Sequence, residues 1–431
     1  MAARRAGTGA AGVEWVFRAS DSAVFDALAK GERGASLSQY FGATAYAELS
    51  TMARKAARAP ARPKRRTGPP VIILPGIMGS TLGASPARRG GAPTVFWIDP
   101  HRIAEGGLMA LAIPAGRPLK PLGVQLFSYA RLKLQLQIDG FDVRFHAYDW
   151  RLGLDELGRE LAARIAAGRE PVILIGHSMG GLVARMAMRL LPKRSVRKLV
   201  MLGTPNRGSF APILAIRGSY PFVRKVATFD PAHSAEYLAQ NVFRTFSGLY
   251  HLLPSRTRTA DIDLYDTASW PARGPSPDPR ILREAESVRR RLAPPDPRMT
   301  HIVGVNRETI VGVRRTGSRF VYDIGFNGDG TVPLALALLP AVRTYYVEEA
   351  HGNLASNPQV IAAAGDLIRR GRTRLLPERW RRRSKVRAHV DDAQLSRFDG
   401  PKIDWRGLAP AQRAAAVAEL NDGGKGFGGK K

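Results

Sequence analysis

Residues 172–185 read VILIGHSMGGLVAR, and this stretch predicts the fold of the chain around it. The branched apolar run Val172–Ile175 is typical of a fully buried strand, and an amphipathic helical pattern follows. Between the two stands Gly176-x-Ser178-x-Gly180. Such a tight strand-to-helix turn accepts only small residues two positions before and two positions after the serine. The turn lifts the serine above the sheet at a helix N-terminus, where a developing negative charge is stabilised.

Further apolar runs of strand length lie on both sides of this turn. The predicted strands are Val71–Leu74, Phe141–Ala147, Pro171–Ile175, Lys198–Leu202, Thr300–Val305 and Thr344–Val347. Helical patterns lie between several of them, notably over residues 154–167 and 181–191. This alternation predicts a mostly parallel sheet with helices on both faces, the α/β class to which the α/β-hydrolase fold belongs.

Changes in amino-acid composition and in the strand–helix pattern divide the chain into three parts. Residues 1–70 are expected to form a helical extension of two or three short helices and a basic linker, since 54–70 contain seven basic residues and four prolines. Residues 71–371 are the predicted α/β-hydrolase domain. Within that domain, aromatic and proline-rich residues 206–298 break the strand–helix rhythm and are interpreted as an inserted cap. Residues 372–431 are basic and end in a Gly/Lys-rich run, which predicts a partly disordered tail.

Composition excludes some chemistry and leaves other questions open. The chain has no cysteine, which rules out disulfides and cysteine nucleophiles. Its net charge of +30 is compatible with nucleic acid or an anionic membrane as partner, but the excess is spread along the chain and is equally explained by compositional bias. The longest nearly apolar stretch, Val332–Val342, is about half a membrane span. We therefore expect no cleaved signal, no transmembrane helix and a cytoplasmic location, with peripheral membrane association left open.

A serine hydroxyl needs a base and an orienting acid, and in this fold the acid precedes the histidine along the chain. His351 follows a predicted strand and lies in a loop, so it is the expected base. Asp329 lies in a glycine-bracketed loop after the extended segment 319–324 and is the expected acid, with Asp323 as substitute. His177, next to Ser178, is expected to point away from it and to be structural. The remaining downstream histidines are expected in the cap, a strand and the tail: His233, His251, His301 and His389.

Two backbone N–H donors are needed to stabilise the tetrahedral oxyanion. One is expected at Met179, directly after the nucleophile, and the other in the glycine-rich loop after the first strand, at Ile77 or alternatively Met78. The aromatic residues Phe210, Tyr220 and Phe222 of the expected cap are predicted to contact acyl chains. Phe243 and Tyr250 are expected to join them. No metal or cofactor is implied.

These segments together resemble the lecithin–cholesterol acyltransferase and lysosomal phospholipase group of α/β hydrolases. The matching pieces are LPGIMGS at 74–80, YDWR at 148–151, GHSMGG at 176–181, LGTPNRG at 202–208, LLPS at 252–255, GDGTVP at 328–333 and HGN at 351–353. The resemblance covers residues 71–370. It implies a Ser–Asp–His mechanism on acyl esters, with lipid esters as substrates and water or an alcohol as acceptor. Without cysteines, the disulfide-stapled lid of eukaryotic members cannot form.

Three functions remain open at this level. The leading prediction is a hydrolase or transferase of lipid acyl groups, and a soluble short-chain carboxylesterase is the alternative. A non-catalytic protein that binds anionic surfaces through its basic tail is the third, and nucleic acid is not the expected partner. Asp149 and Arg151 are expected to form a structural ion pair. The run Arg379–Arg383 surrounds Trp380 with arginines, so we expect the tail to adsorb to anionic membranes and to be dispensable for the chemistry.

Overall fold

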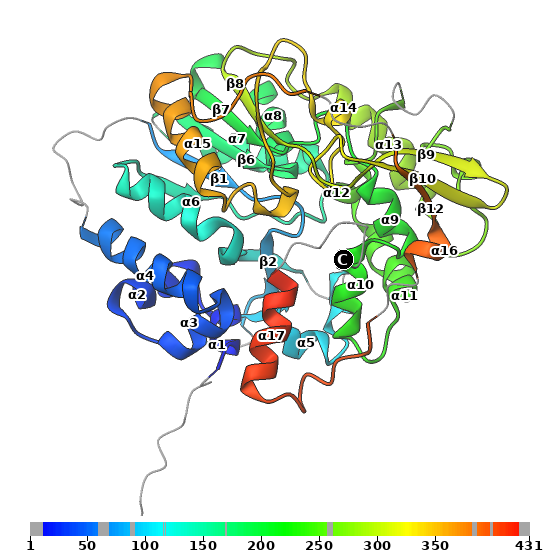
Figure 1. The fold of residues 1–431 in the computed structure, drawn as a ribbon, viewed down its shortest axis with the longest axis horizontal. Coiled ribbons are helices and arrows are strands. Elements are labelled where there is room, and N and C mark those ends of the chain that lie inside the picture. The colour runs from blue at the N-terminus through cyan, green and yellow to red at the C-terminus, as the bar shows by residue number, and fades with distance from the viewer. Residues whose placement is uncertain are drawn as a thin grey trace, which may run out of the picture.

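The computed structural model describes residues 12–58, 69–86, 91–114, 116, 118–168, 170–256, 262–381, 386–396 and 400–421. Its centre is a six-stranded sheet in which every pair of neighbours is parallel (Figure 1). The spatial order is β11 (Arg343–Val347), β8 (Met299–Gly304), β7 (Val196–Leu202), β6 (Val172–His177), β1 (Val71–Leu74) and β5 (Val143–Phe145). The parallel arrangement places the carboxyl ends of all six strands at one edge.

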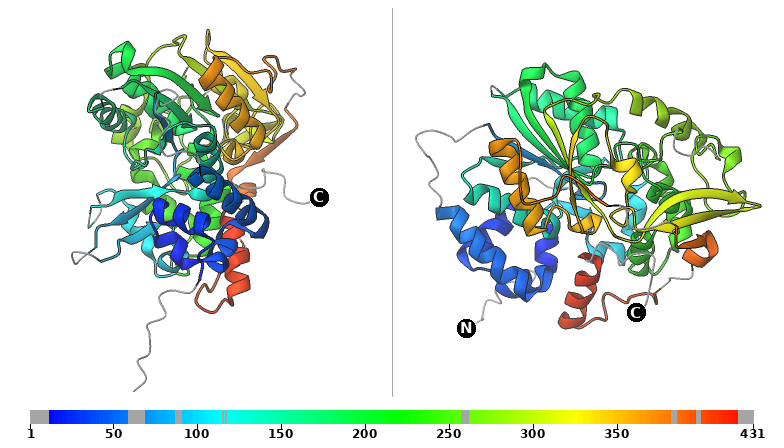
Figure 2. Two further views of the ribbon diagram at one scale, coloured as in Figure 1. Left: turned by 90° about the vertical axis from the view of Figure 1, so that its left-hand side faces the viewer. Right: turned by 45° about the horizontal axis from the view of Figure 1, so that its top comes forward.

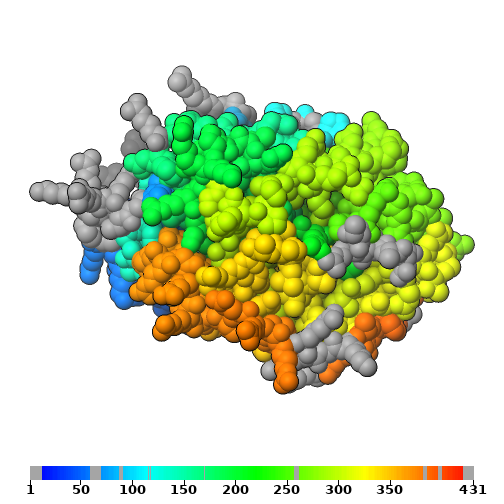
Figure 3. Space-filling view, turned by 90° about the horizontal axis from the view of Figure 1, so that it is seen from above, coloured from blue at the N-terminus to red at the C-terminus, as the bar shows by residue number. Residues whose placement is uncertain are grey.

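Helices cover both faces of this sheet. Helices α6 (Leu126–Ile138) and α15 (Pro358–Arg370) lie on one face, and α7 (Leu154–Ala166) and α8 (Met179–Leu190) on the other (Figures 1 and 2). Strands covered in this way are buried on both sides, which is why all six residues of β6 are buried. Figure 3 shows the end of the molecule where residues near 200 and residues 300–370 lie side by side, as the pairing of β7 with β8 and of β8 with β11 requires.

The six strands predicted from sequence are the six strands of this sheet, with ends that differ by up to two residues. The predicted strand Phe141–Ala147, for example, is Val143–Phe145 in the structure. Two small antiparallel sheets were not anticipated as sheets. One consists of β2 (Ser80–Ala84), β3 (Thr94–Trp97) and β4 (Lys120–Val124), and the other of β9 (Thr309–Thr316), β10 (Arg319–Gly325) and β12 (Ala388–Asp391).

Short helices fill the segment between β7 and β8, where an inserted cap was expected. They are α9 (Ala211–Arg217), α10 (Pro221–Thr228), α11 (Ala235–Asn241), α12 (Ser247–Tyr250) and α13 (Pro279–Arg290), with 3₁₀ turns at Phe243–Thr245 and Thr267–Ser269. Elsewhere the chain forms the single-turn helices α5 (Pro100–Ile103), α14 (Leu334–Ala337) and α16 (Asp392–Leu395) and 3₁₀ turns at Gly107–Leu111, Lys193–Ser195 and His351–Asn353.

Within residues 12–58 the structure has four helices, one more than the upper number expected. These are α1 (Glu14–Arg18), α2 (Asp21–Lys30), α3 (Gly34–Phe41) and α4 (Ala43–Arg58). Helix α4 continues through Arg58, so the first part of the predicted basic linker is helical. Helix α4 packs against α6, which covers one face of the main sheet. Residues 59–68 of that linker lie outside the described residues.

The sequence predicts a partly disordered tail over residues 372–431. The described part of this segment packs onto the rest of the molecule instead. Strand β12 pairs antiparallel with β10, and α17 (Pro410–Asn421) packs against α3 and α10 (Figures 1 and 2). Trp405 and Val417 are fully buried there. These scattered apolar side chains find their partners on helices far away in sequence, so no local pattern reveals the packing. No described helix is both long and apolar enough to cross a membrane.

Four histidines are buried and have lowered pKa values, chiefly because burial disfavours their charged form. The pKa is lowered to about 3 for His177 and His301 and to about 4 for His146 and His251. In the unfolded chain each would bind a proton near its ordinary pKa of 6.5. Between the lowered pKa of the folded state and the ordinary pKa of 6.5, the unfolded state therefore binds more protons than the folded state. In this pH range the free energy of unfolding falls as the pH falls. Burial raises the pKa of Asp21 to about 6 and also raises the pKa of Glu160, so these two carboxyls act in the opposite direction.

We accordingly predict that the free energy of unfolding is several kcal/mol lower at about pH 5 than at about pH 7.5, since each histidine contributes up to about 1.4 kcal/mol per pH unit within its window. Urea unfolding at the two pH values, followed by circular dichroism, measures this difference. Equal free energies at both pH values would contradict the prediction.

Candidate active site

Ser178 lies in the sharp turn between β6 and α8. Its backbone has φ 52° and ψ −123°, a region that ordinary residues rarely occupy. The glycines around it are required by the close packing. A Cβ atom on Gly176 would lie 2.5 Å from the Gly181 nitrogen, and one on Gly180 would lie 2.4 Å from the Pro75 carbonyl oxygen. The turn is therefore clamped between the first turn of α8 and the end of β1.

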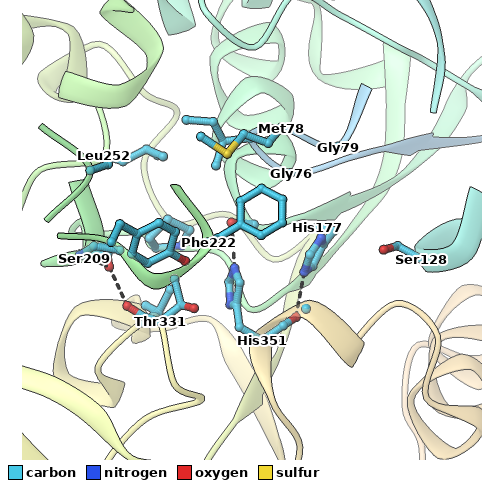
Figure 4. A pocket seen from close by; sticks show the side chains of 18 of the residues that line it. Gly76, Met78, Gly79, Ser128, His177, Ser209, Phe222, Leu252, Thr331 and His351 are labelled. Atoms are coloured by element: carbon cyan, nitrogen blue, oxygen red, sulfur yellow. Dashed lines mark hydrogen bonds between the residues drawn. The ribbon is translucent and has the colours of Figure 1, made fainter. Parts of the chain in front are cut away.

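The predicted acid, base and nucleophile lie together and are connected by hydrogen bonds. Ser178 Oγ is 2.9 Å from His351 Nε2, and His351 Nδ1 is 2.7 Å from Asp329 Oδ2. Figure 4 shows the His351 ring beside the ring of His177. The three residues come from the turn after β6, the loop after β10 and the loop after β11. Strands β6 and β11 are parallel members of the main sheet, so Ser178 and His351 meet at the same edge. Asp329 follows β10 of the smaller antiparallel sheet, and a bridge to Arg307, just after β8, brings it to this edge.

Backbone hydrogen bonds fix the orientation of Asp329. Its Oδ1 accepts the N–H groups of Thr331 at 3.0 Å and Val332 at 2.7 Å, which leaves Oδ2 for the imidazole. The backbone N–H of His351 also donates to the Asp329 carbonyl at 2.8 Å. The carboxylate is 2% exposed, so water does not compete for the imidazole. The substitute candidate Asp323 lies in a different place, on β10, where it pairs with side chains of the two neighbouring strands.

His177 is structural as expected, but it does not point away from the site. Its ring lines the same cavity as Ser178, and its centroid is 5.1 Å from that of His351. Its Nε2 lies 3.0 Å from the His351 carbonyl oxygen, which can only accept, so Nε2 holds the proton. Burial, and then the nearby His351, lower the pKa of His177 to about 3, so Nδ1 is unprotonated. Nδ1 therefore accepts from the Tyr129 hydroxyl at 2.8 Å.

Tyr129 extends this chain of hydrogen bonds to the loop after β1. Its oxygen accepts the Gly76 N–H at 2.9 Å while its hydrogen goes to His177. One continuous series, Gly76–Tyr129–His177–His351, thus connects the glycine loop to the base. No sequence pattern pointed to Tyr129, which lies in the first turns of α6, because a tyrosine in an apolar helix stripe is indistinguishable from an ordinary core residue.

The glycine loop runs directly against the nucleophile. A Cβ on Gly76 would lie 3.0 Å from Ser178 Cβ. The next residue, Ile77, lines the cavity, and its N–H has no acceptor within the described part of the chain. Met179 begins α8, so its N–H belongs to the unpaired donors of a helix N-terminus. Both backbone groups flank Ser178, and their role as oxyanion donors stays a prediction.

The segment 148–151 supports this loop from behind. The Tyr148 hydroxyl donates to the Pro75 carbonyl at 2.6 Å, and the Trp150 indole donates to the Ser80 carbonyl at 3.0 Å. Arg151 and Asp149 form a buried ion pair at 2.6 Å, as the sequence predicted. A buried pair of this kind fixes the backbone geometry more than it adds stability.

A cavity of about 180 Å³ opens beside Ser178 and is largely apolar. Tyr220 and Phe222 line it, as predicted. Phe210 does not: it precedes α9 and is 3% exposed in the core, while Ala211 and Ala215 of that helix face the cavity instead.

Two other aromatic residues of the expected cap also lie away from the cavity. Phe243 packs edge-on against Phe246, and the Tyr250 hydroxyl donates to the Arg244 carbonyl, so both belong to the core of this segment. The cavity wall instead contains residues that sequence reasoning missed. These are, among others, Gln125, Ser128, Leu249, Leu252 and Leu420. Leu420 comes from α17, within the segment expected to be a dispensable tail.

One family model matches the part of the chain that contains the nucleophile turn. The model of the PGAP1-like alpha/beta domain matches residues 159–231, which contain β6, the Ser178 turn and α8. The chain has the α/β-hydrolase fold. The narrower resemblance to the lecithin–cholesterol acyltransferase and lysosomal phospholipase group stays a prediction.

Several solved structures are similar to this α/β-hydrolase chain at low sequence identity. The Tle4–Tli4 complex matches at 14% identity with a TM-score of 0.43, over 70% of this chain and 98% of that one. The Bacillus licheniformis lipase BlEst2 in propeptide form matches at 16% identity with a TM-score of 0.34, over 68% of this chain and 48% of that one. The pyrethroid hydrolase PytH matches at 14% identity with a TM-score of 0.29, over 71% and 99%.

The hydrogen-bond series predicts a positioning role for Tyr129. Tyr129→Phe leaves the Gly76 N–H and His177 Nδ1 unpaired in a buried place, which costs about 1–3 kcal/mol. We expect kcat for ester hydrolysis to fall by roughly 10- to 100-fold with little change in KM, because the base and the loop lose their common support. Steady-state kinetics on a soluble ester, with the half-exposed Tyr237→Phe as matched control, measures this. Equal losses in both variants would rule the role out.

Proposed function

We propose that this chain is a serine hydrolase of carboxylic esters, with Ser178 as nucleophile, His351 as base and Asp329 as the residue that orients the base. The observation that supports it best is the unbroken line of hydrogen bonds from Asp329 through His351 to Ser178, which ends in an apolar cavity. A non-catalytic binding protein would have no need for this alignment.

The reaction proceeds in two steps. His351 Nε2 removes the proton from Ser178 Oγ as the oxygen attacks the ester carbonyl, and the N–H groups of Ile77 and Met179 stabilise the oxyanion. The imidazolium, stabilised by Asp329, then protonates the departing alcohol and leaves an acyl-serine. In the second step His351 activates water, or an alcohol, which attacks the acyl-serine and restores the Ser178 hydroxyl.

The lining of the cavity favours binding of a neutral, apolar acyl group. Among its described lining residues there is no Lys, Arg, Asp or Glu, so a charged phospholipid headgroup would have to lie outside it. Its volume of about 180 Å³ is close to that of an engineered cavity of about 150 Å³ that holds benzene. This size favours a short acyl chain, the second candidate function. The lipid acyl chains implied by the family resemblance require a wall residue to move, and Leu420 of α17 is the natural candidate.

Peripheral membrane binding rests on weaker support. Trp380, the proposed interfacial anchor, is half-buried and packs against the small cluster of Val303, Val305 and their neighbours. Residues 382 and 383 of the arginine run lie outside the described residues. A membrane role therefore stays a proposal that depends on charge alone.

Replacing the nucleophile tests the proposed chemistry. Ser178→Ala should lower kcat for nitrophenyl butyrate by roughly 10⁴- to 10⁶-fold, since the hydroxyl supplies chemistry and not packing. Circular dichroism should show an unchanged fold, and Ser287→Ala, on the exposed side of α13, serves as control. A Ser178→Ala enzyme that keeps more than about a tenth of the wild-type rate would overturn the assignment.

Replacing Leu420 tests the limit on chain length. We expect the wild-type enzyme to prefer butyrate over longer acyl esters, and Leu420→Ala to shift this preference towards longer chains by roughly tenfold, because the smaller side chain extends the cavity. A series of nitrophenyl esters from acetate to palmitate measures the shift. An unchanged chain-length profile would show that Leu420 does not limit the acyl site.

A further inference from the structure

We propose that the start of α6 forms a polar subsite for the alcohol part of the ester, selective for alcohols that bear a neutral hydroxyl group. The inference rests on the proposed function. It assigns the alcohol part of the ester to the start of α6 and the acyl part to the apolar wall of the cavity. Two side chains define the subsite, Gln125 and Ser128, and both line the same cavity as Ser178 and His351.

Gln125 is a buried polar side chain whose amide nitrogen is unpaired within the described part of the chain. It occupies the position before the first residue of α6 and is 5% exposed. Its backbone N–H donates to the Gly79 carbonyl at 2.9 Å, which ties it to the glycine loop. Its side-chain amide nitrogen has no hydrogen-bond partner among the residues that the structure describes, although this nitrogen can donate two hydrogen bonds. Leaving such a donor unpaired in a buried place costs free energy that a ligand oxygen would recover.

Ser128 adds a second donor one helical turn further on. Its backbone N–H donates to the Gln125 carbonyl at 3.0 Å, which fixes the two residues relative to each other. Its hydroxyl is half-buried and has no partner among the described residues. Helix α6 has thirteen residues, so its N-terminus adds a partial positive charge at the same point. All three features favour an oxygen atom that accepts hydrogen bonds.

The two sides of the cavity differ in chemistry. In Figure 4, Ser128 lies on the opposite side of His177 and His351 from Leu252. Leu249, Leu252 and Phe222 form an apolar wall suited to the acyl chain. The polar groups beside this wall bond to one another: the Ser209 hydroxyl donates to the Thr331 carbonyl, and the Tyr220 hydroxyl bonds to the Thr331 side chain. On the other side, the Tyr129 hydroxyl and both ring nitrogens of His177 have partners, so Gln125 and Ser128 are the donors there that remain unpaired within the described part of the chain. That side is therefore left for the alcohol.

The donor set distinguishes a hydroxyl from a phosphate. Sites for phosphate oxygens usually contain Arg or Lys, because charge-assisted hydrogen bonds are needed to replace the hydration of the anion. The described residues around this cavity contain neither. A neutral amide and a neutral hydroxyl match the hydroxyl of a polyol such as glycerol.

The same subsite would bind an attacking alcohol in the second step, because the path of the leaving alcohol is also the path of its return. The alcohol transfers its proton to His351 Nε2 as its oxygen attacks the acyl carbon. The bond to Ser178 Oγ then breaks, and that oxygen receives the proton. Glycerol is therefore expected to compete with water for the acyl group.

Two butyrate esters that differ only in the alcohol test the subsite. We would measure kcat/KM for glycerol monobutyrate and for n-butyl butyrate with the wild-type enzyme, Gln125→Leu and Ser128→Ala. The ratio of the two values should fall by about tenfold in Gln125→Leu and by a smaller factor in Ser128→Ala, which corresponds to the loss of one hydrogen bond. Gln137→Leu, near the other end of α6, is the matched control and should leave both rates unchanged.

The outcomes separate this inference from the proposed function. Wild-type enzyme that hydrolyses neither ester would overturn the proposed function. Hydrolysis of both esters, with a ratio that neither Gln125→Leu nor Ser128→Ala changes, would overturn the subsite alone. Thermal unfolding shows whether Gln125→Leu is folded, and if it is not, Ser128→Ala decides. As a second readout, wild-type enzyme given nitrophenyl butyrate and glycerol should form glycerol monobutyrate, and Gln125→Leu should form several-fold less per butyrate released.

Discussion

The close packing of backbone against backbone around Ser178 is the constraint on which the rest of the site depends. The turn between β6 and α8 touches the end of β1 at Gly180, where a Cβ atom would clash, and the glycine loop at Gly76, where a Cβ atom would lie only 3.0 Å from Ser178 Cβ. This contact forces β1 and β6 to be neighbours in the sheet and places the loop after β1 beside the nucleophile. The strained backbone of Ser178 persists because its surroundings leave no alternative.

Hydrogen bonds then extend this constraint outward in two directions. One series orients the His351 ring through Asp329, whose carboxylate is in turn held by the N–H groups of the loop that contains Asp329. The other passes from Gly76 through Tyr129 and His177 to the carbonyl of His351. Both series end at His351, one at its imidazole and the other at its backbone carbonyl, so the residue is held at its side chain and at its backbone. Neutral His177 suits this role because a second positive charge beside the imidazolium would oppose the proton transfer.

The cavity shows how one fold can combine a fixed reaction centre with an adjustable binding site. The centre is built on strand ends and backbone groups, which vary little in position. The walls come from short helices between β7 and β8, from the start of α6 and from α17, whose Leu420 reaches the site from the C-terminal part of the chain. Because these walls come from separate helices, their residues can change without disturbing the turn at Ser178.

The sequence by itself determined the six strands of the main sheet, the turn at Ser178 and the choice of Asp329 and His351 as acid and base. These follow from local apolar runs, from glycine spacing and from the order of elements along the chain. It could not determine which aromatic residues face the substrate. Phe210 and Tyr220 are both aromatic residues of the expected cap, yet of these two only Tyr220 lines the cavity. Nor could it find Tyr129, Gln125 or Leu420. Their roles arise from contacts between segments far apart in the chain, and an unpaired amide or a buried leucine acquires meaning only when tertiary packing shows what lies beside it.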